Sequence, residues 1–403
     1  MTPGPGLLPG LLLGLLLLGG CGLLRPQPPT PELKRLAGQM LMVGFRGADP
    51  AQNLPILGQI AALNLGGVIL FDRDAALKSP ERNIASPEQL RRLTDALQAA
   101  ASAGGSPPLF IAVDQEGGRV QRLRAARGFA ETPAAAELCP AGLSGPDTAP
   151  AFAAGQTAGA TLAAAGVNLD FAPVADVDVN PENPVIGALG RSFSPDPDQV
   201  AACAGAFARG LKSRGVLTAA KHFPGHGSSR ADSHLGFTDV TDTWTEAELI
   251  PFRALVREHL VDMVMTAHVF NARLDREYPA TLSRPVIHGL LRKQLGFEGV
   301  VVTDDLQMRA VAGRYGLKES VRRIVLAGAD VLLIGNNLDF DETIAAKTLD
   351  ALMELVAEGH LSPHRIQESA ARIQTLKMNL RALAPANTAT PKTHKETPCT
   401  SCL

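Results

Sequence analysis

The 403-residue chain has few aromatic residues, little net charge and no nucleotide-binding motif. Phe, Trp and Tyr make up 4% of it, so a wide aromatic cleft is not expected and polar hydrogen bonds would carry ligand recognition. The formal net charge is −2 and no basic stripe occurs, which gives no electrostatic reason to expect a nucleic-acid partner. No GxGxxG follows the first apolar run and no P-loop motif occurs, so a nucleotide-binding domain is not expected.

Long apolar runs are also lacking, apart from one at the N-terminus. Leu7–Leu18 is too short to span a bilayer comfortably and suits a secretory signal. The sequence LGGC, ending at Cys21, resembles a bacterial lipoprotein signal, although no Lys or Arg precedes Arg25. We therefore expect export and a lipid on Cys21 that anchors the protein at the periplasmic side of a bacterial membrane. The alternatives are an uncleaved leader and a cytoplasmic protein.

This interpretation divides the chain into four parts. A signal peptide over residues 1–20 is followed by a proline-rich tether over 21–32, a single domain over 33–383 and a disordered tail over 384–403. The five cysteines add little to the interpretation. Cys139 and Cys203 each stand alone, and the CxxC of Cys399 and Cys402 lies in the tail without a second CxxC, so no redox or zinc function is predicted there.

Eight short apolar runs alternate with amphipathic segments in the main domain. Helix-start signals lie between them, such as Ser86-Pro87, the capping box Thr245–Glu248 and Ser362-Pro363. This alternation predicts an α/β fold, a single (β/α)8 TIM-type barrel without a second domain, with a doubly wound open sheet as the alternative. The predicted strands are Gln39–Phe45, Gly67–Phe71, Leu109–Val113, Val167–Phe171, Val216–His222, Met263–Thr266, Val300–Thr303 and Val331–Ile334.

Polar and charged side chains follow six of the predicted strands, where barrel enzymes build their sites. The richest group is Lys221–Phe237, which holds His222, His226 and His234 and cannot be helical because Pro and Gly interrupt it. Asp232 and His234 lie two apart, so in extended backbone the carboxylate would reach the imidazole, fix its tautomer and favour its charged form.

Two other interpretations of this stretch remain open. One is a loop satisfied by its own hydrogen bonds. The other is a zinc pair formed by His222 and His226, although the residues between them remove the helix that would make their spacing useful.

A carboxylate and a protonatable group across one pocket suit retaining glycoside hydrolysis. Asp304 ends the seventh strand and is the expected nucleophile, whereas Asp305 is expected to face away or to begin the next helix. His234 would be the acid/base and Asp232 its partner, with nucleophile and acid/base roughly 5–6 Å apart. No cofactor or metal is required. The candidate substrate-binding residues are Asp114, Arg122, Arg191, Lys221, His222 and His268.

Residues 33–340 resemble the barrel of glycoside hydrolase family 3, in its NagZ-like β-N-acetylglucosaminidase branch. The resemblance implies Asp304 as nucleophile, the Asp232–His234 pair as acid/base and a site that holds terminal β-linked N-acetylglucosamine, with peptidoglycan fragments as the expected substrate. The matching segments are VDQEGGRVQR (113–122), NLDFAPVADV (168–177), GRSF (190–193), KHFPGHG with ADSH (221–234), MTAH (265–268) and TDDLQM (303–308).

Three rival functions remain open. A phosphorolytic enzyme could use the same pair, because a histidine base does not repel phosphate as a carboxylate would. A zinc hydrolase and a non-catalytic sugar-binding lipoprotein are the other two. The sequence indicates no oligomeric state.

Overall fold

The computed structural model describes Met1 and residues 29–52, 54–142 and 145–383. The predicted leader, Cys21, most of the tether and the tail lie outside these residues. The first helix of the domain begins at Pro31, two residues before the predicted start of the domain, with Thr30 as its N-cap. Among the described residues, no helix combines the length and apolar character needed to cross a membrane.

Eight parallel strands form the sheet, in the order β13-β11-β9-β8-β3-β2-β1-β14. A bridge between Val302 and Val331 joins the two ends of this order, so the sheet closes into a barrel. Every predicted strand is present, because each run is long enough and apolar enough to be buried on both faces. The strands are β1 Leu41–Gly44, β2 Gly67–Ile69, β3 Phe110–Val113, β8 Leu169–Asp170, β9 Leu217–Phe223, β11 Met263–Thr266, β13 Val300–Thr303 and β14 Leu332–Ile334.

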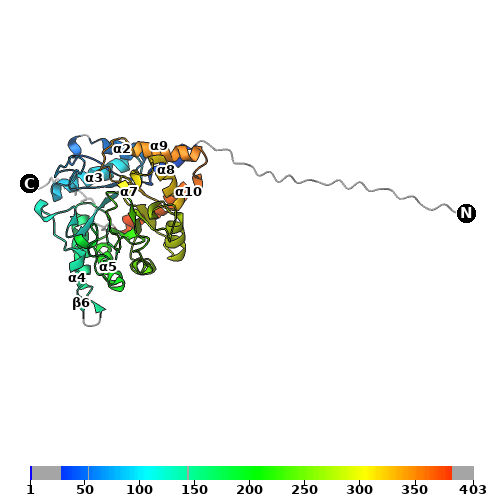
Figure 1. Ribbon diagram of the computed structural model, residues 1–403. Coiled ribbons are helices and arrows are strands. Elements are labelled where there is room, and N and C mark those ends of the chain that lie inside the picture. The colour runs from blue at the N-terminus through cyan, green and yellow to red at the C-terminus, as the bar shows by residue number, and fades with distance from the viewer. Residues whose placement is uncertain (2–28, 53, 143–144, 384–403) are drawn as a thin grey trace, which may run out of the picture.

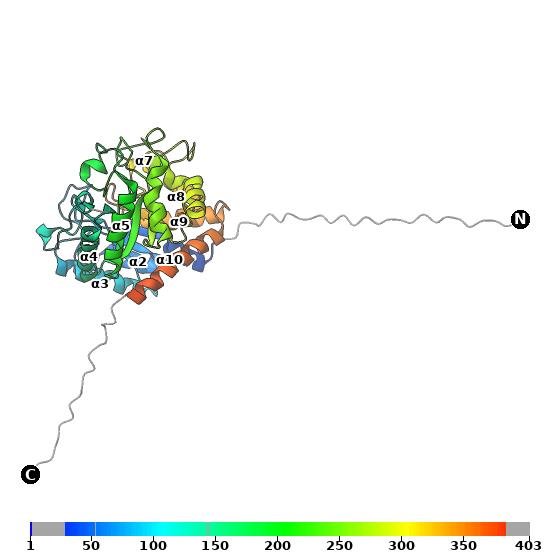
Figure 2. The same ribbon diagram turned by 90° about the horizontal axis from the view of Figure 1, so that it is seen from below.

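Helices surround the barrel, and Figure 1 shows them as a ring. In Figure 2, α7 and α10 lie at opposite ends of the molecule. The helices are α1 Pro31–Gly38, α2 Pro55–Leu63, α3 Pro87–Ala103, α4 Ala149–Ala164, α5 Pro197–Lys212, α6 Ile250–Arg257, the π-helix η7 Pro285–Gln294, α7 Arg309–Ala312, α8 Leu317–Ala327, α9 Ile344–Ala357 and α10 Pro363–Leu383.

Short elements occupy the connections between these helices and strands. Three two-stranded ladders pair β4 with β5, β6 with β7, and β10 with β12. The remaining elements are β4 Gln115–Gly117, β5 Val120–Gln121, β6 Ala141–Gly142, β7 Gly145–Pro146, β10 Thr238–Asp239, β12 Val269–Phe270, η1 Pro50–Gln52, η2 Ala125–Arg127, η3 Ala135–Glu137, η4 Gly187–Leu189, η5 Glu246–Leu249 and η6 Ala280–Leu282.

The helix-start signals were confirmed in two of three cases. Ser86 caps α3 by accepting a hydrogen bond from the backbone of Gln89, and α10 begins at Pro363. The predicted capping box Thr245–Glu248 is wrong, because Thr245 makes no side-chain cap hydrogen bond. Glu248 is instead fully buried and accepts hydrogen bonds from the backbone amides of Gly227 and Ser228. The backbone amides of Gly227 and Ser228 thus bind the carboxylate that was predicted to cap the helix, because a tertiary contact overrides the local signal.

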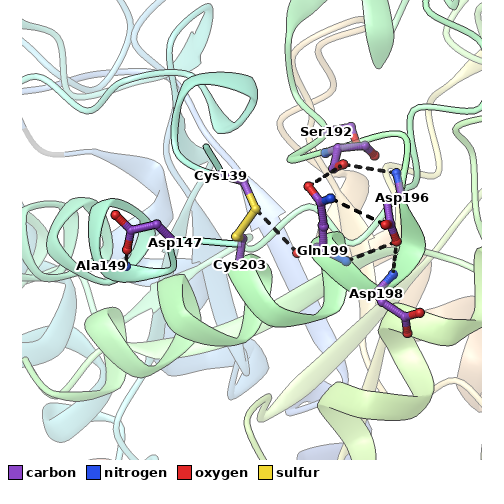
Figure 3. The surroundings of a disulfide bond; sticks show 9 residues. Cys139, Asp147, Ala149, Ser192, Asp196, Asp198, Gln199 and Cys203 are labelled. Carbon is purple, nitrogen blue, oxygen red and sulfur yellow. Dashed lines mark hydrogen bonds between the residues drawn. A yellow bond between two sulfur atoms is a disulfide. The ribbon is translucent and has the colours of Figure 1, made fainter. Parts of the chain in front are cut away.

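Cys139 and Cys203, for which no pairing was predicted, form a disulfide (Figure 3). Cys203 lies on α5, and Cys139 lies on the connection between β3 and α4. The bond spans 64 residues of sequence, with 5.9 Å between the two Cα atoms. It fastens the connection that follows β3 to the helix that follows β8. Asp196 caps the N-terminus of the same helix, accepting from Asp198 and Gln199 (Figure 3).

Candidate active site

A pocket of about 310 Å³ opens at the carboxyl ends of the barrel strands. Its walls come from most of the strands in turn, including Ile69 of β2, Lys221 of β9, Met265 of β11 and Leu333 of β14. Parallel strands bring their carboxyl ends to one mouth, so residues far apart in sequence meet there. The predicted residues on its lining are Asp114, Arg122, Arg191, Lys221, His222, His234 and Asp304.

One side of the pocket is a charged wall formed by Asp114, Glu116, Arg122, Arg191 and Lys221. The Lys221 ammonium lies 2.7 Å from Asp114 and 2.6 Å from Glu116. Arg191 makes two 2.7 Å hydrogen bonds to the Glu116 carboxylate, and Arg122 lies 3.1 Å from Asp114. Two parallel bonds from one guanidinium fix its plane, so the wall is a rigid array of donors and acceptors.

The charged wall keeps its charges because the opposite charges are adjacent. Burial opposes ionisation of Asp114, but Lys221 and Arg122 hold the pKa of its carboxyl well below the usual range. Burial likewise opposes the charge of Glu116, and Arg191 with Lys221 still lowers its pKa. Burial alone would lower the pKa of Lys221, whereas Asp114 and Glu116 raise it. Such an array suits a polar, uncharged ligand rich in hydroxyl groups.

His222 continues this wall and is fixed by Asp176. Its Nδ1 lies 2.6 Å from the Asp176 carboxylate, which is fully buried. Carboxylate oxygens only accept, so Nδ1 carries the hydrogen. Nε2 then accepts from Arg191 at 3.3 Å. Both ring nitrogens therefore have protein partners.

The Asp232–His234 pair, the dyad, forms as predicted but on a different backbone. His234 Nδ1 lies 2.7 Å from Asp232 Oδ1, and the backbone amide of His234 donates to the same oxygen at 2.8 Å. The predicted extended backbone is wrong, since residues 233–235 form a turn. An aspartate that accepts from the amide two residues later makes an Asx turn. The turn leaves Nε2 of His234 as the nitrogen free to face the pocket.

Asp304 and Asp305 both border the pocket. Burial raises the pKa of Asp304, but His268, His222 and His234 more than offset this and the net change is downward. Asp305 accepts from the backbone amides of Gly335 and Gln307, and burial raises its pKa to about 6. Asp305 was expected to face away or to start a helix, whereas α7 begins only at Arg309 and Asp305 stabilises a turn.

His268 does not line the pocket. It is buried, with Nδ1 2.8 Å from the hydroxyl of Thr281 and Nε2 2.9 Å from the backbone carbonyl of Asp305. Both ring nitrogens are thus occupied by protein groups. This placement favours a role in supporting the Asp304–Asp305 turn over the predicted contact with substrate.

The predicted zinc pair is not favoured by this geometry. His226 is buried, and its two nitrogens lie 3.1 Å from the hydroxyls of Ser229 and Ser233. Nδ1 of His222 is taken by Asp176. The residues that the structure describes contain no cluster of three His, Cys, Asp or Glu side chains suited to a metal ion.

Comparison with known proteins decides the family. Residues 33–376 match the glycosyl hydrolase family 3 N terminal domain. The chain belongs to glycosyl hydrolase family 3. Among the similar curated proteins, the β-hexosaminidase LpqI of Mycobacterium tuberculosis is 35% identical over 84% of this chain and 81% of its own length. β-Hexosaminidase A of Pseudoalteromonas piscicida is 34% identical over 86% of this chain, which spans only 61% of that protein.

Solved structures agree with this family 3 assignment and with the barrel. A family 3 β-N-acetylglucosaminidase from a Paenibacillus species aligns with a TM-score of 0.78 and 36% identity over 91% of this chain and 66% of the other. A β-N-acetylhexosaminidase from Beutenbergia cavernae aligns with a TM-score of 0.75 and 33% identity over 87% of this chain and 99% of the other.

Three residues of this family 3 site escaped the sequence-based selection. Glu116 pairs with Arg191 and Lys221, and its spacing of two from Asp114 was the available signal. Asp176 pairs with His222, and although it lies in the segment NLDFAPVADV (168–177), it was not among the predicted site residues. Arg73 is exposed and borders the pocket. No motif in the surrounding sequence indicates that it lies there.

Proposed function

We propose that this family 3 barrel is a retaining exo-β-N-acetylglucosaminidase, a β-hexosaminidase. The observation that carries the proposal is that Asp304 and the His234 imidazole line one pocket, with the charged wall on the same lining. A pocket of about 310 Å³ suits the single terminal residue of a glycan. The names of the similar proteins, β-hexosaminidases and β-N-acetylglucosaminidases, support the same activity.

The proposed reaction has two displacements. In the first, an oxygen of Asp304 bonds to the anomeric carbon while the bond to the leaving oxygen breaks, and that oxygen takes the proton from Nε2 of His234. In the second, water attacks the anomeric carbon, its proton returns to Nε2 and the bond to Asp304 breaks. Asp232 holds Nδ1–H throughout, so that Nε2 is the nitrogen that exchanges the proton. The lowered pKa of Asp304 keeps the nucleophile ionised.

The charged wall would hold the sugar hydroxyls in this scheme, and His222 would orient Arg191 within it. Carboxylates accept hydrogen bonds and the guanidinium and ammonium groups donate them, so both sides of a hydroxyl can be satisfied. A terminal sugar that lacks one of these hydroxyls would lose hydrogen bonds to the charged wall without replacing the water it displaces, which disfavours its binding.

A peptidoglycan fragment is the proposed natural substrate. Arg73 is exposed at the pocket and, among the described residues, has no carboxylate within ion-pair distance. A muramic acid leaving group or its peptide carries a carboxylate that such a cation can bind. Arg73→Ala should reduce kcat/KM on an N-acetylglucosaminyl-muramic acid disaccharide by about 10-fold, since a bond to a charged group contributes about 1.5 kcal/mol or more. Chitobiose, which has no carboxylate, is the control, and an equal loss on both substrates would refute the role of Arg73.

The decisive experiment follows hydrolysis of an aryl N-acetyl-β-glucosaminide by the wild type and by Asp304→Ala. We expect loss of nearly all activity in the variant, a first product of β configuration by NMR, and a covalent adduct on the wild type with a fluorosugar donor by mass spectrometry. Unchanged turnover by Asp304→Ala would rule out the nucleophile. Sugar 1-phosphate as the main product in phosphate buffer would instead favour the phosphorolytic alternative, and binding without turnover the sugar-binding one.

Export with a lipid on Cys21 is the proposed location. The Cys139–Cys203 disulfide supports it, because such bonds persist in oxidising compartments outside the cytoplasm. In a bacterial host, the wild type should be recovered with membranes and incorporate labelled fatty acid, and Cys21→Ser should do neither. Recovery of both proteins in the cytoplasmic fraction would contradict the proposal.

A further inference from the structure

The dyad has little attachment of its own to the barrel. The side chains of Asp232 and His234 are 25% and 50% exposed. In the part of the chain that the structure describes, their hydrogen bonds run only to each other and to the backbone of the same turn. General acid catalysis needs the imidazole within hydrogen-bond reach of the leaving oxygen. Something beneath the turn must therefore fix its position.

Ser233, the residue between the two members of the dyad, is turned the other way. It is 2% exposed, and its hydroxyl lies 3.1 Å from Nε2 of His226, which is equally buried. The hydroxyl of Ser229 lies 3.1 Å from Nδ1 of the same ring. One imidazole thus joins two points of the loop that carries the dyad.

The hydrogen positions in this cluster can be assigned from the partners. The Ser229 hydroxyl donates its one hydrogen to the backbone carbonyl of Ala231, so it accepts from Nδ1–H of His226. Nε2 is then the acceptor, and the Ser233 hydroxyl donates to it. Burial lowers the pKa of His226 to about 4, so the neutral ring needed for this arrangement is present near neutral pH.

His226 is itself fixed to the barrel. Its backbone amide donates to Asp176 at 2.8 Å, and the side chain of Asn183 donates to its backbone carbonyl at 2.7 Å. Asp176 is the same carboxylate that orients His222 in the pocket. Hydrogen bonds therefore connect the sugar-binding side of the site, through Asp176 and His226, to Ser233, which the chain joins to both members of the dyad.

We propose that His226 and Ser233 are positioning residues. They hold the Asp232–His234 dyad at the distance from Asp304 that proton transfer to the leaving oxygen requires. This inference rests on the proposed function, because it assigns a task to residues that support the proposed acid/base. Neither residue lines the pocket, so neither is expected to contact the sugar.

The test compares two substrates in the same protein sample. The dinitrophenolate of a dinitrophenyl N-acetyl-β-glucosaminide leaves without protonation, whereas the sugar leaving group of chitobiose needs the acid. The ratio measured is kcat/KM for the dinitrophenyl substrate divided by kcat/KM for the substrate that needs the acid. This ratio does not depend on the fraction of folded protein. The variants are Ser233→Ala, Ser233→Thr, which keeps a hydroxyl, His234→Ala, and the control Ser369→Ala, which removes a buried hydroxyl bond to Asp330 remote from the pocket.

We expect the ratio to rise about 10- to 100-fold in Ser233→Ala. Acid–base catalysis supplies about 10²–10⁴-fold, and a misplaced imidazole should lose part of that factor. It should return toward the wild-type value in Ser233→Thr, stay there in Ser369→Ala and rise furthest in His234→Ala. An unchanged ratio in Ser233→Ala beside a raised ratio in His234→Ala overturns the positioning role alone. An unchanged ratio in His234→Ala overturns the proposed function and this inference with it.

Discussion

At the scale of single residues, neighbouring carboxylates acquire different tasks from their surroundings. Asp304 faces three imidazoles that favour its ionised form, whereas Asp305 accepts from backbone amides in a buried turn and has a pKa raised to about 6. Environments that separate two pKa values in this way are typical of acid–base sites. The sequence placed both residues at one strand end but could not predict which amides would meet Asp305.

Lys221 illustrates how much a buried ion pair matters here. Lys221→Met removes the cation shared by Asp114 and Glu116, which keep Arg122 and Arg191, so we expect the free energy of unfolding to fall by about 1–3 kcal/mol. Lys318→Met is the matched control, because Lys318 also bridges two carboxylates but on the surface, where little change is expected. Urea unfolding of both variants measures the difference. Equal effects would show that burial does not decide the strength of these pairs.

Glu248 gives a pH dependence with a definite sign. Burial raises the pKa of its carboxyl from 4.5 to about 7, so between these values the folded chain holds a proton that the unfolded chain has lost. The free energy of unfolding should therefore fall as the pH rises through this window. One pKa unit corresponds to about 1.4 kcal/mol, which sets an upper limit of about 3 kcal/mol.

Glu248→Gln removes this titration while retaining an oxygen for the amides of Gly227 and Ser228. Denaturant unfolding between pH 4.5 and 7 should show the variant becoming more stable relative to the wild type as the pH rises. A constant difference between the two proteins across that range would exclude Glu248 as the titrating group.

At the scale of elements, the eight strands were predictable because buried parallel strands are continuous apolar runs. The pairing of Cys139 with Cys203 was not, since it depends on how α5 packs across 64 residues of sequence. The dyad was predicted from the spacing of two residues between Asp232 and His234. The Asx turn that brings the two side chains together could not be predicted, because it depends on the backbone conformation of residues 232–234. Glu248 was assigned to a helix cap because sequence shows only its near neighbours.

The disulfide should stabilise the connection that carries Asp114, Glu116 and Arg122. Closing a loop of this length removes about 4 kcal/mol of unfolded-state entropy. We expect Cys139→Ser with Cys203→Ser to lower the free energy of unfolding by up to that amount, and reductant to do the same to the wild type. The double serine variant is its own control, because reductant should not affect it further. A reductant effect of equal size on both proteins would point to another origin.

At the scale of the whole molecule, the described chain is one closed barrel with its site at one end. All residues to which we assign a task in the reaction lie between Arg73 and Asp304. The Paenibacillus and Pseudoalteromonas relatives extend beyond the aligned part, so additional segments in those proteins are not represented here. The barrel should therefore support the chemistry without help from other parts of the chain.

A protein of residues 29–383 tests this expectation. We expect it to fold and to hydrolyse the aryl glycoside with the kcat/KM of the full chain, because the barrel closes within these residues. The same Asp304→Ala change in both lengths is the control for background activity. A marked loss in the shortened protein alone would mean that a terminal segment contributes to the site.

The mutual neutralisation along the charged wall has a practical outcome for kinetics. The opposite charges lower the pKa values of Asp114 and Glu116 and raise those of Arg191 and Lys221. The charges of these four groups therefore stay the same from mildly acidic to mildly alkaline solution. A change of pH in this range can then alter the rate at which a bound glycan is cleaved without altering how strongly the charged wall binds it.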